Sequence, residues 1–299
     1  MYKLVTRYIS SAALILIAVG SLLSSGCSAS KSANPEVSAG DKAYARAVAM
    51  YDKKQYQAAV IGLEPLLYTY RATALEDDVL YLLAQSYYYS GDYLLSAEMY
   101  SRLLQQLPSS AYARVSQFML AKSYEQLSPP ADLDQQPTRK AIENFALYID
   151  RYPMKDSSKI ATDLETWREL LKINPQNPTY KERYATAIAQ FSRIDSLRYS
   201  EKSIALLREK LAKNLIVVAR KYVQLGKYRA AGIFFDQLVT RYGDTSHVKE
   251  AMEGKIDMLM KRQKWFEAGH ELDRYLQRFP EKKSVMQGVR DKIAENSKN

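Results

Sequence analysis

The stretch LYLLAQSYYYSGDYLLSAEMYSRLLQQLP, residues 80–108, describes two helices joined by a tight turn. Its apolar residues at positions 80, 83, 84 and 87 have the i, i+3, i+4, i+7 spacing of one face of an amphipathic helix. Gly91 and Asp92 are turn residues, and the second helical pattern, from Tyr93, ends at Pro108. The stretch therefore predicts a helix–turn–helix unit.

The pattern of the second helix of this unit occurs in six blocks along the chain, this one included. Each has a small residue and, four positions later, a large apolar one. The small residues, at spacings of 37, 45, 46, 44 and 37, are Ala59, Ser96, Ala141, Ala187, Ala231 and Ala268. The large residues are Leu63, Tyr100, Phe145, Phe191, Phe235 and Leu272.

Helix pairs with a small residue at their crossing and a closing proline resemble tetratricopeptide repeats, whose period is about 34 residues. We therefore predict an all-α fold, an α-solenoid of about five to six tetratricopeptide-like helix pairs, with the recurring residues in its core. The longer spacings imply longer helices or inserted loops, such as the loop at 128–137. Pro65 lies inside the second helix of the first repeat and should kink it.

The repeats divide the body of the chain into four parts. We assign N-terminal repeats to 41–155, an extra helix pair to 156–200, C-terminal repeats to 201–285 and a tail to 286–299. The N-terminal repeats would supply a groove for substrates, and the C-terminal repeats a docking surface for partners.

The N-terminus has the layout of a secretory signal, assigned to residues 1–26. Lys3 and Arg7 precede an apolar run at 9–23, which is shorter than the roughly 20 residues of a membrane-spanning helix. The only cysteine, Cys27, follows Gly26 in a segment that resembles the lipobox of bacterial lipoproteins, although Ser24 stands where the lipobox has Leu. That resemblance implies that Cys27 carries a lipid. An ordinary signal peptide with a cysteine nearby is the alternative.

Residues 27–40 are small, polar and marked by Pro and Gly, which predicts a flexible tether. A single cysteine allows no intramolecular disulfide, so the body must be held by packing. In bacterial lipoproteins, Asp after the cysteine retains the protein at the inner membrane. Ser28 at that position implies an outer-membrane lipoprotein that faces the periplasm.

The net charge of +10 is concentrated in the C-terminal part. Residues 27–200 hold 20 basic and 20 acidic side chains, whereas residues 201–299 hold 21 basic and 13 acidic ones. This imbalance indicates either an acidic partner for the C-terminal repeats or a solvated basic surface.

Motifs that carry chemistry do not stand out. His247 and His270 are 23 residues apart with no cysteine near either, so no zinc spacing exists. There is no P-loop. We predict a binding module with no catalytic residue, metal or cofactor, and no nucleic-acid partner for an exported chain. The alternative from another class is an exported enzyme accessory or a lytic enzyme with a helical platform.

Two segments, 133–153 and 202–231, resemble the BamD family of outer-membrane assembly lipoproteins. The residues that match the family pattern are Asp134, Gln135 and Ala141 in the first segment and Leu207, Arg208, Lys210 and Leu211 in the second. The resemblance covers about 42–283 and departs from the family at 156–200, where this chain is longer.

The resemblance implies a non-catalytic scaffold of the β-barrel assembly machinery. Its partners would be the POTRA domains of the BamA subunit, sister Bam lipoproteins and unfolded outer-membrane proteins. The alternative within the same class is a generic tetratricopeptide lipoprotein that scaffolds a cell-envelope or peptidoglycan-synthesis complex.

A column of aromatic residues in the N-terminal repeats is a candidate peptide site. Tyr44, Tyr81 and Phe118 are 37 residues apart, so they occupy equivalent places on successive first helices. Tyr51 and Tyr88, seven residues after the first two, would share that face; Tyr89 is adjacent to it, and Lys122 lies four residues after Phe118. Aligned rings could hold alternate side chains of an extended peptide, and Lys122 could reach its carboxylate. The alternative is that the rings fill junctions between neighbouring first helices.

Overall fold

The computed structural model describes residues 39–154 and 157–297, and within them every regular element is a helix. The first six helices are α2 (Ala39–Asp52), α3 (Tyr56–Leu63), α4 (Leu66–Thr69), α5 (Glu76–Ser90), α6 (Tyr93–Gln106) and α7 (Ala113–Gln126). They are followed by α8 (Gln136–Arg151), α9 (Ser157–Ile173), α10 (Pro178–Gln224), α11 (Tyr228–Arg241), α12 (Val248–Lys261), α13 (Trp265–Arg278), the 3₁₀ turn η1 (Pro280–Lys282) and α14 (Gln287–Asn296).

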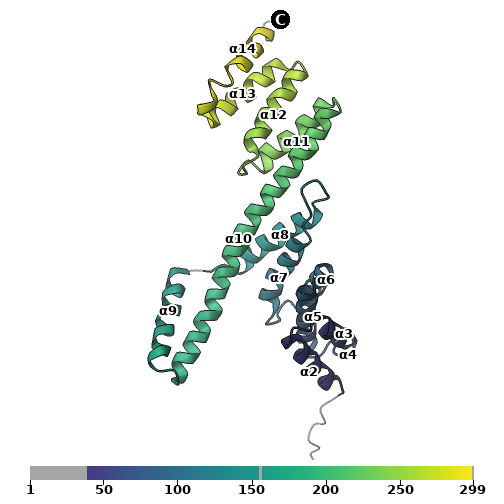
Figure 1. Ribbon diagram of the computed structural model, residues 1–299, viewed down its shortest axis with the longest axis vertical. Helices are drawn as coiled ribbons and strands as arrows, with labels where there is room; N and C mark the ends of the chain where they lie inside the picture. Colours follow the sequence, from purple (N-terminus) through teal and green to yellow (C-terminus); the bar gives the residue numbers. More distant parts are fainter. Residues whose placement is uncertain (1–38, 155–156, 298–299) are drawn as a thin grey trace, which may run out of the picture. The chain divides into compact units, whose positions relative to one another are not determined.

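Each helix packs mainly on its neighbours in the chain, as a solenoid requires. α5, α6, α7 and α8 pack in sequence, and so do α10, α11, α12 and α13 (Figure 1). The chain divides into the units Met1–Lys42 and Ala43–Asn299, and the packing described below lies within the second. The all-α solenoid prediction is confirmed. The predicted signal and Cys27 lie outside the described residues.

The turn inside a repeat depends on one left-handed residue. Gly91 has φ 92°, and the N–H of Asp92 donates to the carbonyl of Tyr87 at 2.9 Å, which closes α5 in a Schellman motif. Gly226 holds the same place between α10 and α11 with φ 67°. Lys54 and Gln263 adopt this conformation at the equivalent turns, where glycine is absent.

The recurring small residues lie where the two helices of a repeat cross. All six are buried, from 0 to 4% exposed, and so are their large partners, except for the half-buried Phe191. Ser96 replaces alanine at one crossing because its hydroxyl has partners there. Its Oγ donates to the carbonyl of Ala84 at 2.9 Å and lies 3.1 Å from Ser123 Oγ. The prediction that these positions form the core is confirmed for five of the six pairs; Ala187 and Phe191, in the first part of α10, belong to none of the core clusters.

Pro65 divides the second helix of the first repeat, as predicted. α3 ends at Leu63 and the short α4 begins at Leu66, because proline lacks the N–H that would continue the helical ladder.

The described residues differ from the expected boundaries in two places. α10 is one helix of 47 residues that crosses the boundary expected at 200/201. Its first part packs on α9 and its later part on α8 and α11. No Gly or Pro occurs from 179 to 225, so no helix-breaking residue ends the helix near the expected boundary.

The second difference is at the C-terminus. Residues expected to be a tail include the helix α14, whose Ile293 is 6% exposed in the C-terminal core. α14 packs on α13 and covers part of its apolar surface.

Three buried clusters form the core. One lies within α2–α7 and one within α10–α14. The third, made by Ala121, Ala141, Phe145 and Leu207, joins α7 and α8 to α10. Among the described residues, no helix has the length and apolarity needed to cross a membrane.

Candidate functional site

Five tyrosines meet at the turns of the first two repeats, and we call them the turn cluster: Tyr51, Tyr56, Tyr88, Tyr89 and Tyr93. Contacting ring centroids are 5.2 to 6.2 Å apart, and Tyr56 stacks on Tyr89. The rings come together because α2 and α5 end, and α3 and α6 begin, at the same edge of the repeats. Tyr89 is 51% exposed and the other four are half-buried. The turn cluster therefore offers one accessible ring on an aromatic support.

A second aromatic cluster surrounds Tyr81, nearer the beginning of α5. Tyr81 stacks on Tyr112 with ring centroids 4.3 Å apart, and Tyr112 donates its hydroxyl to Asp78 Oδ1 at 2.6 Å. Gln85 links this pair to the turn cluster. Its Oε1 accepts from the Tyr51 hydroxyl at 2.8 Å, and its Nε2 donates to the Tyr81 hydroxyl at 2.5 Å.

The third cluster surrounds Phe118 on α7. Its ring contacts Phe145 and Tyr148 of α8 and Tyr199 of α10, with centroids 5.3 to 6.1 Å apart. The Lys122 ammonium lies 5.0 Å from the Tyr199 ring centroid, 5.7 Å from that of Tyr88 and 5.8 Å from that of Phe118. Such cation–π contacts hold the lysine against the rings.

All seven residues of the predicted peptide site lie within the described N-terminal repeats. Six of them take part in the ring, cation–π and hydrogen-bond contacts above, and Tyr44 is half-buried against the N-terminal core. These rings also pack on second-helix rings that the sequence analysis did not include in the site. Tyr56 and Tyr93 had a detectable signal, since they are 37 residues apart and each lies three before a small core residue. The peptide-binding role stays a prediction.

Burial raises the pKa of four phenols in this region. Burial, with smaller effects of Tyr93 and Glu125, raises the pKa of Tyr88 to about 12. Burial also raises the pKa of Tyr44, Tyr51 and Tyr81. At neutral pH these hydroxyls can donate hydrogen bonds.

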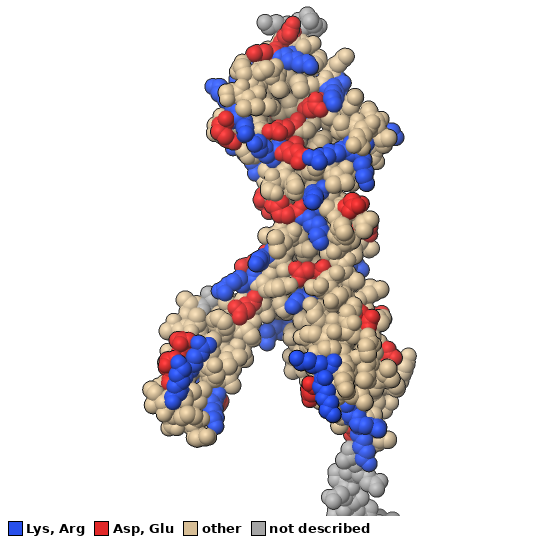
Figure 2. All heavy atoms as spheres, in the orientation of Figure 1, with Lys and Arg blue, Asp and Glu red and all other residues tan. Residues whose placement is uncertain are grey.

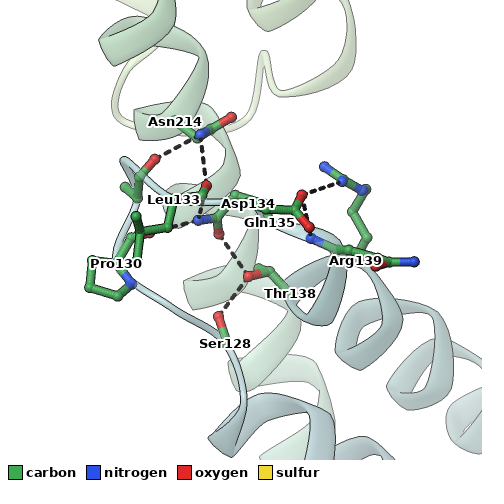
Figure 3. A network of polar contacts seen from close by, with 10 residues as sticks. Ser128, Pro130, Leu133, Asp134, Gln135, Thr138, Arg139 and Asn214 are labelled. Atoms are coloured by element: carbon green, nitrogen blue, oxygen red, sulfur yellow. Dashed lines mark hydrogen bonds and ion pairs between the residues drawn. The ribbon is translucent and has the colours of Figure 1, made fainter.

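The loop between α7 and α8 is fixed by Gln135, one of the residues that match the family pattern (Figure 3). The Gln135 side chain is 2% exposed and donates to the carbonyls of Pro130 at 2.7 Å and Leu133 at 3.0 Å. It accepts from the Thr138 hydroxyl at 2.7 Å. The 2.7 Å contact between Thr138 Oγ1 and Ser128 Oγ closes the network. The loop therefore provides hydrogen-bond partners for both the Nε2 and the Oε1 atom of this buried amide.

α10 holds the same loop from the other side. Lys210 Nζ donates to Ser128 Oγ at 2.9 Å, and Asn214 Nδ2 donates to the carbonyl of Ala131 at 2.7 Å. On the same helix, Arg208 pairs with Asp244, which lowers the pKa of that carboxyl. The residues that match the family pattern therefore join repeats to one another.

The basic excess of the C-terminal repeats is not a uniform patch. On the face shown in Figure 2, basic and acidic side chains alternate over the C-terminal helices. Several are paired: Lys255 bridges Asp236 at 2.6 Å and Glu271 at 2.9 Å, and Arg274 reaches Glu271 at 3.1 Å. Positive charge that can attract a partner must come from the unpaired cations.

A metal site does not emerge from the described geometry. Across residues 39–154 and 157–297, no three His, Cys, Asp or Glu side chains are grouped to hold an ion.

The family model that matches this chain covers the N-terminal repeats and α9. A family model described as YfiO, outer membrane lipoprotein, matches residues 38–174. The outer membrane protein assembly factors BamD of Neisseria meningitidis and Neisseria gonorrhoeae are each 26% identical to this chain over 186 residues. The alignments cover 58% of this chain and 68% of each relative. The resemblance to the BamD family is confirmed.

Outside these BamD-like relatives, solved helical-repeat proteins are similar at lower identity. A tetratricopeptide repeat protein from Parabacteroides merdae is 12% identical, with 87% of this chain and 99% of that chain covered and a TM-score of 0.33. A thermophilic repeat protein from Thermus thermophilus is 14% identical, with coverages of 87% and 100% and a TM-score of 0.29. With scores this low, neither structure defines how the repeats of this chain are arranged.

Proposed function

We propose that this chain is a non-catalytic lipoprotein scaffold of outer-membrane β-barrel assembly, anchored at the outer membrane and facing the periplasm. The observation that carries the proposal is the match of residues 38–174 to an outer-membrane lipoprotein family, over repeats that hold the three aromatic clusters. In the proposal, the N-terminal repeats bind unfolded barrel proteins. The C-terminal repeats dock on the POTRA domains of a BamA subunit, beside sister Bam lipoproteins.

The turn cluster is the best candidate for the substrate contact. Tyr89 is about half exposed, and its ring is supported by Tyr56 and Tyr51. Aromatic rings attract other aromatic and apolar side chains, and a tyrosine adds a hydroxyl. An extended segment with alternate aromatic side chains, such as a strand of an unfolded barrel protein, can place one ring against Tyr89 and offer backbone groups to the neighbouring phenols.

The experiment measures binding of a synthetic peptide that copies the C-terminal strand of a barrel protein. We expect Tyr89→Ser to lower the affinity about ten-fold, the equivalent of 1.4 kcal/mol, since one aromatic contact and its buried area are lost. The thermal midpoint should change little because the side chain is half exposed. Tyr68→Ser is the matched control, since Tyr68 is 85% exposed on α4 and belongs to none of the three clusters.

The double variant Tyr44→Ser with Tyr81→Ser tests the alternative that the rings are structural. Tyr81 stacks on Tyr112 and bonds to Gln85, so its loss should lower stability as well. Unchanged peptide binding in Tyr89→Ser, together with unchanged binding by the folded fraction of the double variant, would remove the substrate role of these rings.

A further inference from the structure

Two adjoining hollows lie beside the turn between α10 and α11. Their volumes are about 490 and 500 Å³, and Arg229, Ile233 and Arg262 line both. The turn residue Lys227 lines the second hollow, and Asp236 and Lys255 line the first. Both hollows are open at the surface, so a ligand would lie against them and stay partly exposed.

Four cations line this double hollow, and one of them, Lys255, is paired with Asp236 and Glu271. Among the described residues, the side chains of Lys227, Arg229 and Arg262 form no hydrogen bond or ion pair. The nearby acids already have partners: Asp236 pairs with Lys255 of the same hollow, and the pKa of Glu267 is lowered by its 2.5 Å pair with Lys264 and also by Arg262. The second hollow has no acidic residue in its lining. The double hollow is therefore positive where the surrounding surface is largely balanced.

The double hollow is also apolar. Ile233 is 52% exposed between the two arginines, and Tyr228 and Ala230 line the second hollow beside it. Lys261 Nζ lies 5.0 Å from the Tyr228 ring centroid and is itself paired with Asp257 at 3.2 Å. A free anion such as phosphate would use the arginines and leave the aliphatic surface wet. A ligand that carries carboxylates next to an aliphatic side chain would use both.

We propose that the double hollow binds an acidic protein segment in which Asp or Glu side chains flank an aliphatic residue. The carboxylates pair with Arg229 and Arg262, and the aliphatic side chain covers Ile233. Two guanidinium groups favour carboxylates through bidentate hydrogen bonds. This inference rests on the scaffold role proposed above and adds to it the surface and the chemistry of one partner contact.

The test uses the purified full chain in detergent and a fluorescein-labelled dodecapeptide of Asp, Glu, Leu and Ala. The same peptide with Lys in place of its acids is the reference. We expect the acidic peptide to bind and Arg229→Ala with Arg262→Ala to lower its affinity at least ten-fold. The double variant should also flatten the dependence of affinity on salt. Ile233→Ser should lower the affinity about three-fold with the salt dependence unchanged.

The matched control removes two exposed cations of α10 away from the hollows, in Lys202→Ala with Lys213→Ala. It should change the affinity less than two-fold. An equal loss in this control, or tight binding retained by the arginine double variant, would overturn the proposal. Displacement of the peptide by anionic vesicles or millimolar phosphate would overturn it too, by assigning the arginines to phosphate groups.

Binding of the barrel-strand peptide, measured on the same samples, separates the two proposals. If the arginine double variant still binds the barrel-strand peptide, its loss of acidic-peptide binding is confined to the double hollow. If the unaltered chain binds the acidic peptide and not the barrel-strand peptide, the substrate role fails and the double hollow stands.

Discussion

Gly254 in α12 shows how closely the C-terminal repeats are packed at the scale of single residues. A Cβ at this position would lie 2.5 to 2.8 Å from three atoms of the Phe235 ring, closer than van der Waals contact allows. Phe235 is 5% exposed and holds one of the recurring large positions. The absence of a side chain at Gly254 is therefore what lets α11 and α12 approach.

We expect Gly254→Ala to lower the free energy of unfolding by about 1–3 kcal/mol, because overpacking outweighs the gain in helix propensity. Gly232→Ala is the control, since its Cβ would lie an ordinary 3.7 Å from Met258 Cβ. That variant should raise the free energy of unfolding by about 0.5–1 kcal/mol. Urea unfolding measures the free energy of unfolding of both variants. Equal stabilisation by both substitutions would contradict the packing described here.

At this scale, sequence reasoning found the core residues better than the surface contacts. The small residues Ala59 and Ala231 could be predicted because a helix crossing admits little else, and spacing alone locates it. The partners of Tyr81 and Phe118 could not be predicted in the same way. Spacing tells which face of a helix carries a ring, whereas Tyr112 and Tyr199 reach those rings from other helices.

The long helix α10 is the feature that matters most at the scale of elements. It pairs with α9, supports α8 and pairs again with α11. The expected boundary at 200/201 came from the repeat period, which counts helix pairs and cannot tell whether two consecutive helices are fused. The absence of Gly and Pro between 179 and 225 was the available signal.

Continuity of α10 can be tested with Glu201→Pro, at an exposed position in the middle of the helix. Proline removes the hydrogen bond to the carbonyl of Leu197 and clashes with it, so we expect a loss of about 3 kcal/mol or more. Glu201→Ala should be nearly neutral. Denaturation followed by circular dichroism makes the comparison, and a proline variant as stable as the alanine variant would indicate two helices hinged at the expected boundary.

At the scale of the whole molecule, the proposed function requires a lipid anchor as well as a repeat scaffold. If Cys27 carries the lipid, Cys27→Ser should leave a chain without lipid that partitions into the soluble fraction. More than one acyl chain is needed for stable anchoring, so partial loss of acylation should release it as well. Fractionation and mass spectrometry of both chains measure this, and a Cys27→Ser chain that stays firmly in the outer membrane would contradict a purely lipid anchor.

The central claim, a role in barrel assembly, is tested most directly by purifying the tagged full chain from solubilised outer membranes. The proteins that co-purify are then quantified by mass spectrometry. An outer-membrane lipoprotein with the same tag and an unrelated body is the control. We predict recovery of a β-barrel protein with POTRA domains in an amount comparable to the chain itself, and none with the control. Recovery of peptidoglycan-synthesis proteins without any such barrel protein would contradict the account.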